Sequence, residues 1–159
     1  MTMPPTTPTP ATPADSGAPL GPDGFPRPEA WLEHRVSYGE TDAMKVVYYA
    51  EYLHYFERAR SLFIRERGMS YATVEERGIA LPITEASVRY KRPLRYDDLA
   101  LVRVGISQWR GASVCFAYEV YAEDRTTLHA TGSTRHACVD PAGRPVRIPG
   151  WLRDLFQEP

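Results

Sequence analysis

One short segment, residues 38–52, concentrates the side chains that could do chemistry. Asp42 stands seven residues before Tyr49, where a long helix is predicted to begin. A carboxylate can act as a base or a nucleophile, and the free amide N–H groups at a helix N-terminus can stabilise an oxyanion. A hydrolase needs both parts. The spacing by itself favours a simpler role, in which Asp42 only caps the turn.

Familiar catalytic motifs are absent from the sequence. It contains no G-x-S-x-G, no H-E-x-x-H, no Walker loop and no G-x-G-x-x-G, which argues against a serine-triad hydrolase and a nucleotide enzyme. Cys115 and Cys138 suggest neither a disulfide framework nor a metal site, and we expect buried, inert thiols. We therefore expect no metal and no cofactor.

Hydrophobic periodicity predicts the elements that must position Asp42. A strand is expected at Trp31–Tyr38, and residues 49–67 contain no Gly or Pro until Gly68, as is typical of one long helix with a glycine stop. Alternation with a period of two then predicts four strands, at residues 83–93, 99–109, 113–122 and 128–139. A short helix is expected at 149–156. The fold class is α+β, with one helix against a curved antiparallel sheet.

Composition limits the class of protein. The chain has 159 residues, of which 43% are hydrophobic, and 19 Lys and Arg balance 20 Asp and Glu. One globular domain fits this length, and a net charge of -1 argues against a nucleic-acid partner. No apolar run is long enough to cross a bilayer, and the N-terminus does not resemble a secretory signal. We therefore expect a cytoplasmic protein with no membrane insertion.

The N-terminal residues differ in composition from the rest. Nine of the 15 prolines fall in residues 1–30, with few large apolar residues among them. Such a segment cannot bury enough surface to compensate its loss of conformational entropy. We predict that residues 1–29 are a disordered tail rich in Pro and Thr, and that residues 30–159 form the folded domain.

A single helix covers only one face of a sheet whose strands carry apolar residues on both faces. The segment 112–118 shows this clearly, since its apolar residues occupy alternate and intervening positions alike. An open edge or face of this kind needs a partner. We expect a homodimer, extended to a homotetramer as a dimer of dimers.

Two motifs in the expected order resemble a known family. The string YGETDAM at residues 38–44, continued by VVYY at 46–49 and FERAR at 56–60, is similar to the signature of the 4-hydroxybenzoyl-CoA thioesterase family of hotdog-fold acyl-CoA thioesterases. The turn PLRYDD at 93–98 matches a second family feature. The order of elements agrees over residues 31–157.

The resemblance implies a hotdog domain at residues 30–159, an active site between two subunits, and a role for Asp42. In the family, the matching aspartate attacks the thioester carbonyl or activates water. The backbone N–H at the helix start, here that of Tyr49, polarises the carbonyl oxygen. Glu57 is an alternative catalytic carboxylate, because some hotdog thioesterases use an acidic residue of the central helix.

The chain departs from the family pattern in the turn beside Asp42. Lys45 stands where many members have Gly, so the turn loses a permissive residue and gains a charge beside Asp42. Lys45 could keep Asp42 ionised, steer an anionic substrate, or simply point into water. Tyr at position 49 matches the hydroxybenzoyl branch, which favours an aromatic acyl group slightly over a short aliphatic one.

Basic residues are candidates for contacts with the phosphates of coenzyme A. Arg110 matches one position of a basic run that the hydroxybenzoyl branch places at this turn, while Gly111 and Ala112 replace the other positions. Arg92 belongs to a second basic cluster, and Lys45 is the third candidate. Each could equally be a solvated charge at a strand end.

We therefore predict an acyl-CoA thioesterase that converts an acyl-CoA with a short or aromatic acyl group to free acid and coenzyme A. A hotdog hydratase or dehydratase is one alternative, but residues 43–47 lack the His that those enzymes place after the Asp. A non-catalytic acyl-CoA-binding protein is the other, and Lys45 is the feature that keeps it open.

Overall fold

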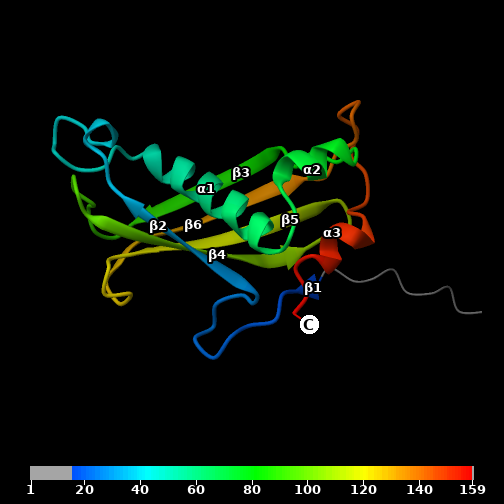
Figure 1. The fold of residues 1–159 in the computed structure, drawn as a ribbon, viewed down its shortest axis with the longest axis horizontal. Helices are drawn as coiled ribbons and strands as arrows, with labels where there is room; N and C mark the ends of the chain where they lie inside the picture. Colours follow the sequence, from blue (N-terminus) through cyan, green and yellow to red (C-terminus); the bar gives the residue numbers. More distant parts are fainter. Residues whose placement is uncertain (1–15, 159) are drawn as a thin grey trace, which may run out of the picture.

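The computed structural model describes residues 16–158. Its six-stranded antiparallel sheet has the order β1-β4-β5-β6-β3, and β2 also pairs with β4 (Figure 1). The strands are β1 Ser16–Gly17, β2 Glu29–Arg35, β3 Ile83–Tyr90, β4 Leu99–Trp109, β5 Ser113–Tyr121 and β6 Leu128–Ala137. The helices are η1 Tyr38–Glu40, α1 Glu51–Glu66, α2 Tyr71–Glu76 and α3 Gly150–Asp154. The predicted α+β class and the order of its main elements are confirmed.

The long helix α1 lies across one face of the sheet (Figure 1). Its buried side chains are Tyr52, Tyr55, Phe56, Ala59, Phe63 and Ile64. A glycine in β6 makes the close approach possible, because a Cβ at Gly132 would lie 2.3 Å from the Phe56 ring. Phe56 also stacks on Tyr118 of β5 with ring centroids 4.2 Å apart. Beyond the helix, Gly68 has a φ of +92°, as the glycine stop requires.

Several boundaries differ from the sequence prediction. Helix α1 begins at Glu51, so Tyr49 lies in the preceding turn, and β2 ends at Arg35. Helix α2 was not predicted; its N-cap Ser70 accepts a hydrogen bond from the Thr73 amide at 3.1 Å. This is an ordinary Ser cap that local composition could have indicated.

The predicted boundary of the folded domain at residue 30 is wrong, because residues 16–29 pack on the sheet. β1 pairs with β4, and Phe25 is buried on Gly105 of β4, where a Cβ would lie 3.1 Å from the Phe25 ring. We call residues 16–28 the N-terminal strap. Residues 1–15, the rest of the predicted tail, lie outside the described residues.

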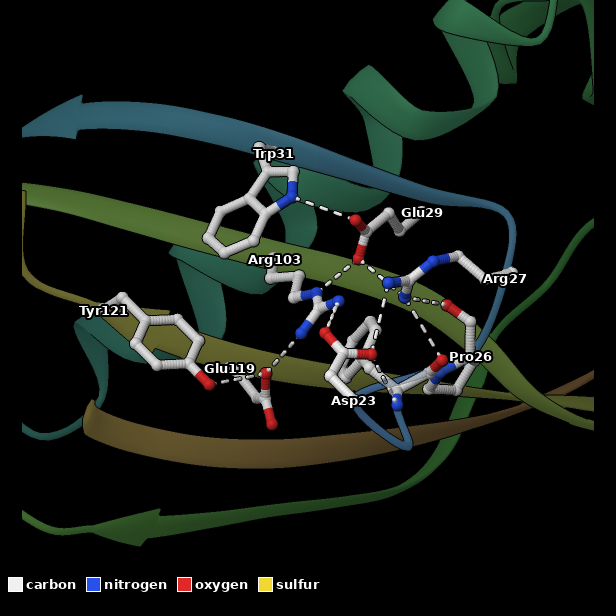
Figure 2. A network of polar contacts seen from close by, with 9 residues as sticks. Asp23, Pro26, Arg27, Glu29, Trp31, Arg103, Glu119 and Tyr121 are labelled. Carbon is white, nitrogen blue, oxygen red and sulfur yellow. Dashed lines mark hydrogen bonds and ion pairs between the residues drawn. The ribbon is translucent and has the colours of Figure 1, made fainter. Parts of the chain in front are cut away.

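A buried arginine holds the N-terminal strap on the face of the sheet opposite α1 (Figure 2). The Arg103 guanidinium donates to Asp23 of the strap at 2.5 Å, to Glu29 at the start of β2, and to Glu119 of β5 at 3.2 Å. The hydrogen bond from Arg103 lowers the pKa of Asp23 to about 2. The aromatic rings of Phe25 and Trp31 also face the guanidinium. No sequence pattern pointed to this network, because its members are far apart in the chain.

Two further observations complete the fold. Cys138 is buried and Cys115 is partly buried, and both are free thiols. Within residues 16–158, no helix is both long and apolar enough to span a membrane.

Candidate active site

Asp42 lies in a tight loop between η1 and α1 whose own backbone orients the carboxylate. The Asp42 amide donates to the Val46 carbonyl at 3.0 Å, and the Lys45 amide donates to the Asp42 carbonyl at 2.9 Å. The Met44 amide donates to Oδ1 of Asp42 at 2.8 Å. One carboxylate oxygen is thus fixed by the loop. In the described part of the chain, Oδ2 receives no hydrogen bond.

Lys45 adopts the left-handed conformation, with a φ of +64°. This conformation is easy for glycine and unfavourable for a residue with a Cβ. The position therefore explains why glycine is the ordinary residue here. The Lys45 side chain is exposed at the tip of the loop and does not line the cavity described below.

The loop is anchored at both ends. The Val47 amide donates to the Leu94 carbonyl at 2.8 Å, and the Tyr48 amide donates to the Glu40 carbonyl at 2.9 Å. Glu40 is itself buried, with its carboxylate 2.8 Å from Nε2 of His34 and bonded to the Ser37 amide. Burial raises the pKa of Glu40, but these hydrogen bonds outweigh it and lower the pKa below its usual range. The ionised carboxylate thereby fixes η1 beneath the loop.

A groove of about 430 Å³ opens beside the loop. Its walls include Asp42, Tyr49, Tyr52, Tyr90 and Arg92, and we call it the Asp42 groove. The Tyr90 hydroxyl donates to the Tyr49 carbonyl at 2.8 Å, which ties the end of β3 to the turn before α1. The groove thus combines one carboxylate, aromatic walls and a basic rim.

The amide N–H of Tyr49 is free to bind a ligand. Among residues 16–158 it meets no acceptor, whereas the next amide but one, that of Glu51, donates to the Tyr48 carbonyl at 2.9 Å. Tyr49 lies in the turn just before the N-cap of α1, where the helix dipole favours a negatively charged oxygen at an unpaired N–H. Asp42 and the Tyr49 residue line the same groove, as the two halves of a hydrolytic site must.

Two tyrosines beside the groove remain protonated at neutral pH. Burial raises the pKa of Tyr52 and of Tyr90, whose rings meet edge to face with centroids 5.1 Å apart. Their hydroxyl groups are therefore neutral donors. Neither hydroxyl group is a phenolate that could compete with Asp42 for a proton.

Two of the predicted site residues, Arg110 and Glu57, lie apart from Asp42 within one chain. Arg110 follows β4 at the opposite end of the sheet, where its carbonyl accepts from Arg153 of α3 at 3.2 Å. Glu57 is exposed on α1 and lines a separate cavity. Of the three basic candidates, only Arg92 lines the Asp42 groove.

Sequence reasoning missed three contributors. Tyr90 and the Met44 amide shape the groove, and the buried pair of Glu40 with His34 supports it. Glu40 lies six residues after His34 and beyond the end of β2, so strand periodicity could not predict the pair. The string at residues 38–44 did contain Glu40, and its proximity to Asp42 was the available signal.

Comparisons with known proteins agree with this geometry. The profile described as Thioesterase-like superfamily matches residues 36–156. The acyl-CoA thioesterase YbgC of Haemophilus influenzae is 35% identical over 125 residues, which cover 77% of this chain and 90% of the relative. The solved structure of a DHNA-CoA thioesterase from Staphylococcus aureus is 31% identical with a TM-score of 0.73, covering 79% of this chain and 85% of that one.

A solved 4-hydroxybenzoyl-CoA thioesterase, bound to 4-hydroxybenzoyl-CoA, has a TM-score of 0.74 over 81% of this chain and 99% of its own. At 20% identity it supports the fold alone. The match over residues 36–156 extends from the end of β2 through α3 and includes the whole Asp42 loop. The chain therefore belongs to the thioesterase-like superfamily and shares the hotdog fold of relatives that are named as acyl-CoA thioesterases.

Proposed function

We propose that this protein is an acyl-CoA thioesterase that uses Asp42 and the Tyr49 amide to hydrolyse a short-chain or aromatic acyl-CoA. The observation that carries the proposal is that both residues line one groove, with one carboxylate oxygen of Asp42 and the amide N–H of Tyr49 unpaired within the described residues. The names of the relatives support thioester hydrolysis.

The proposed reaction needs one base and one oxyanion donor. In the first route, Asp42 takes a proton from water while the water oxygen attacks the thioester carbonyl carbon. The Tyr49 N–H stabilises the resulting oxyanion. When the intermediate collapses, the carbon–sulfur bond breaks and the proton held by Asp42 passes to the sulfur of coenzyme A. No metal or cofactor takes part.

In the second route, the Asp42 carboxylate attacks the carbonyl itself and expels the thiolate of coenzyme A. Water then hydrolyses the mixed anhydride that remains. Label found in Asp42 after a single turnover in ¹⁸O-labelled water would establish the second route. Label enters the Asp42 carboxylate only if water attacks the aspartyl carbonyl of the anhydride.

Arg92 and Lys45 are proposed to attract the phosphates of coenzyme A at the open side of the groove, since both are exposed cations close to Asp42. Arg110 lies at the other end of the sheet. Arg110 can approach an Asp42 groove only in an oligomer in which the Arg110 end of one chain lies beside the Asp42 groove of another.

We propose such an assembly, a homodimer formed through β3. This strand is an edge of the sheet and pairs only with β6 on its inner side. Seven of its eight residues are exposed, including Ile83 and Tyr90 at 50% each. A long edge with apolar side chains is a template for pairing, and a second copy can supply a matching strand. The tetramer stays a prediction.

The test is release of free thiol from a panel of short, long and aromatic acyl-CoAs. We expect the substitution Asp42→Asn to lower kcat by about 10²–10⁴-fold because it removes the base or nucleophile. Asp97→Asn is the matched control, since Asp97 is an exposed carboxylate outside the groove. Full activity of Asp42→Asn would contradict the assignment. Binding of acyl-CoA without any thiol release from the wild type would favour the non-catalytic alternative.

A further inference from the structure

A second cavity, of about 260 Å³, lies between α1, α2 and the sheet. Its apolar walls include Ile64, Leu81, Ile83 and Phe116, and its polar members include Arg60. We call it the Arg60 cavity. It opens near the Ile83 end of β3, whereas the Asp42 groove opens near the Tyr90 end.

Both openings lie on the same face of the sheet. Tyr90 meets Tyr52 of α1, so it points to the helix side. A bulge between Ile83 and Glu85 shifts the alternation of β3, and Ile83 pairs with the buried His136 on that same side. The two ends of one edge strand thus carry two different pockets on one face.

Pairing of β3 with a second copy along its full length brings these pockets together. Two antiparallel strands related by a twofold axis place Ile83 of one chain opposite Tyr90 of the other. Because the axis is perpendicular to the sheet, helix α1 of both chains lies on the same face of the combined sheet. The Arg60 cavity of each chain then adjoins the Asp42 groove of its partner.

A chain of buried hydrogen bonds holds the Arg60 guanidinium in its cavity. Arg60 donates to the Tyr118 hydroxyl at 3.0 Å, and this hydroxyl is 2.8 Å from that of Thr134. The Thr134 hydroxyl is 2.8 Å from Nε2 of His136, whose Nδ1 is 2.8 Å from the Leu81 carbonyl. Each member therefore has a defined partner.

The direction of each hydrogen bond in this series follows from the bond between His136 and Leu81. The Leu81 carbonyl can only accept, so Nδ1 of His136 carries a proton. Burial lowers the pKa of His136 to about 4, so the ring is neutral and Nε2 accepts from Thr134. Tyr118 then donates to Thr134 and accepts only from Arg60. All directions are fixed, and Arg60 is a positioned cation with further N–H groups to offer.

The cavity contains a second available donor. The Tyr71 hydroxyl oxygen accepts from the Leu81 amide at 3.0 Å, which leaves its own proton for another acceptor. Arg60 forms no ion pair with any carboxylate in residues 16–158, although Glu57 lines the same cavity. An oxygen atom on an otherwise apolar ligand would satisfy these donors.

We infer that Arg60 of the partner subunit determines acyl specificity, and that the preferred acyl group carries a hydrogen-bond-accepting oxygen at its distal end. The thioester lies at Asp42 of one chain, and the acyl group extends into the partner's cavity. The inference rests on the proposed thioesterase function and on the β3 dimer.

The first test compares kcat/KM for matched acyl-CoAs with and without a terminal hydroxyl, such as hexanoyl-CoA and 6-hydroxyhexanoyl-CoA, at several chain lengths. We expect the wild type to prefer the hydroxylated member at one length at least. Arg60→Met should lower this preference by roughly tenfold or more, because a hydrogen bond from a charged donor is lost. Arg65→Met is the control, since Arg65 is an exposed arginine on the same helix outside both pockets.

An unchanged preference in folded Arg60→Met would overturn the inference, as would a wild type that prefers the plain acyl group at every length. If Arg60→Met does not fold, Arg60→Lys replaces it. Lysine keeps the charge but cannot reproduce the planar guanidinium contacts, so the preference should fall without being abolished.

The second test asks which chain supplies Arg60. A heterodimer of one Asp42→Asn chain and one Arg60→Met chain is isolated with two affinity tags. If the site is shared, one of its two sites contains both changes and the other contains neither. We expect about half of the wild-type kcat, with the wild-type preference for the hydroxylated acyl group.

If each chain forms its own site, the heterodimer contains no intact site. Its preference would then equal that of the Arg60→Met homodimer, and the shared site would be wrong. Failure of the thioesterase proposal is distinguishable from both results. In that case the wild type itself releases no thiol from any substrate.

Discussion

At the scale of single residues, Lys45 shows how backbone conformation determines which residue type is favoured at one position of the family. The loop that orients Asp42 requires a φ of +64° at position 45. Lysine bears the steric cost of a Cβ in that conformation, while its amide still completes the turn to the Asp42 carbonyl. The loop geometry is therefore compatible with lysine, at a loss of stability.

We predict that Lys45→Gly raises the free energy of unfolding by about 0.5–1 kcal/mol, because glycine adopts a positive φ without steric cost. Urea denaturation measures the change. Lys45→Ala keeps the Cβ and should give no comparable gain. Equal stability of the Gly and Ala variants would show that the backbone of residue 45 is not strained.

At the scale of secondary-structure elements, the packing of α1 on the sheet depends on Gly132. The Phe56 ring occupies the space that a side chain on β6 would fill. Gly111, in the turn between β4 and β5, has no neighbour within 4 Å of its added Cβ and serves as the control.

Gly132→Ala is expected to destabilise the protein by about 1–3 kcal/mol or more, since the added methyl group overlaps the Phe56 ring. Gly111→Ala should change the free energy of unfolding by less than about 0.5 kcal/mol. Chemical denaturation of the two variants decides the matter. Similar values for both would mean that α1 can shift away from β6 at little cost.

The N-terminal strap is an element held mainly by one charge. Arg103 is buried, while its partners Asp23, Glu29 and Glu119 are partly exposed. Removing the guanidinium leaves three carboxylates facing one another on the outer face of the sheet (Figure 2).

Arg103→Met should therefore lower the free energy of unfolding by about 2–3 kcal/mol and release residues 16–28 from the sheet. Hydrogen exchange of the strap amides measures the release directly. Arg144→Met is the control, because Arg144 makes only an exposed pair with Asp140. Unchanged protection of the strap in Arg103→Met would mean that Phe25 and β1 hold it without the ion pairs.

At the scale of the whole molecule, the exposed edge of β3 controls assembly in our proposal. Full-length twofold pairing places Ala86 within one residue of the centre of the contact, so that residue 86 of one chain lies diagonally across the axis from its own copy. Carboxylates at this position would repel each other across the axis.

Ala86→Asp should raise the dimer dissociation constant by at least about tenfold, and analytical ultracentrifugation would show a larger share of the 18.0 kDa chain as monomer. Ala142→Asp, in an exposed turn after β6, is the control. If both variants kept the mass distribution of the wild type, β3 would not be the interface. Thiol release from the same samples tests whether activity follows the dimer.

The sequence by itself determined the α+β class, the order of the main elements and the family, and these predictions are confirmed. Each depends on local information. The apolar period of α1, the stop at Gly68 and the alternation in β4 to β6 lie within short stretches of chain. The string around Asp42 is also continuous, which is why the candidate residues at 42 and 49 could be named in advance.

Only the tertiary structure decided the contacts between distant residues. Arg103 meets Asp23 across 80 positions, and Arg60 reaches His136 through Tyr118 and Thr134. The prediction of a disordered segment up to residue 29 failed for this reason. Composition describes what a segment can bury by itself, whereas residues 16–28 gain their stability from a charge and a glycine supplied by β4, on a sheet that forms only when the whole chain has folded.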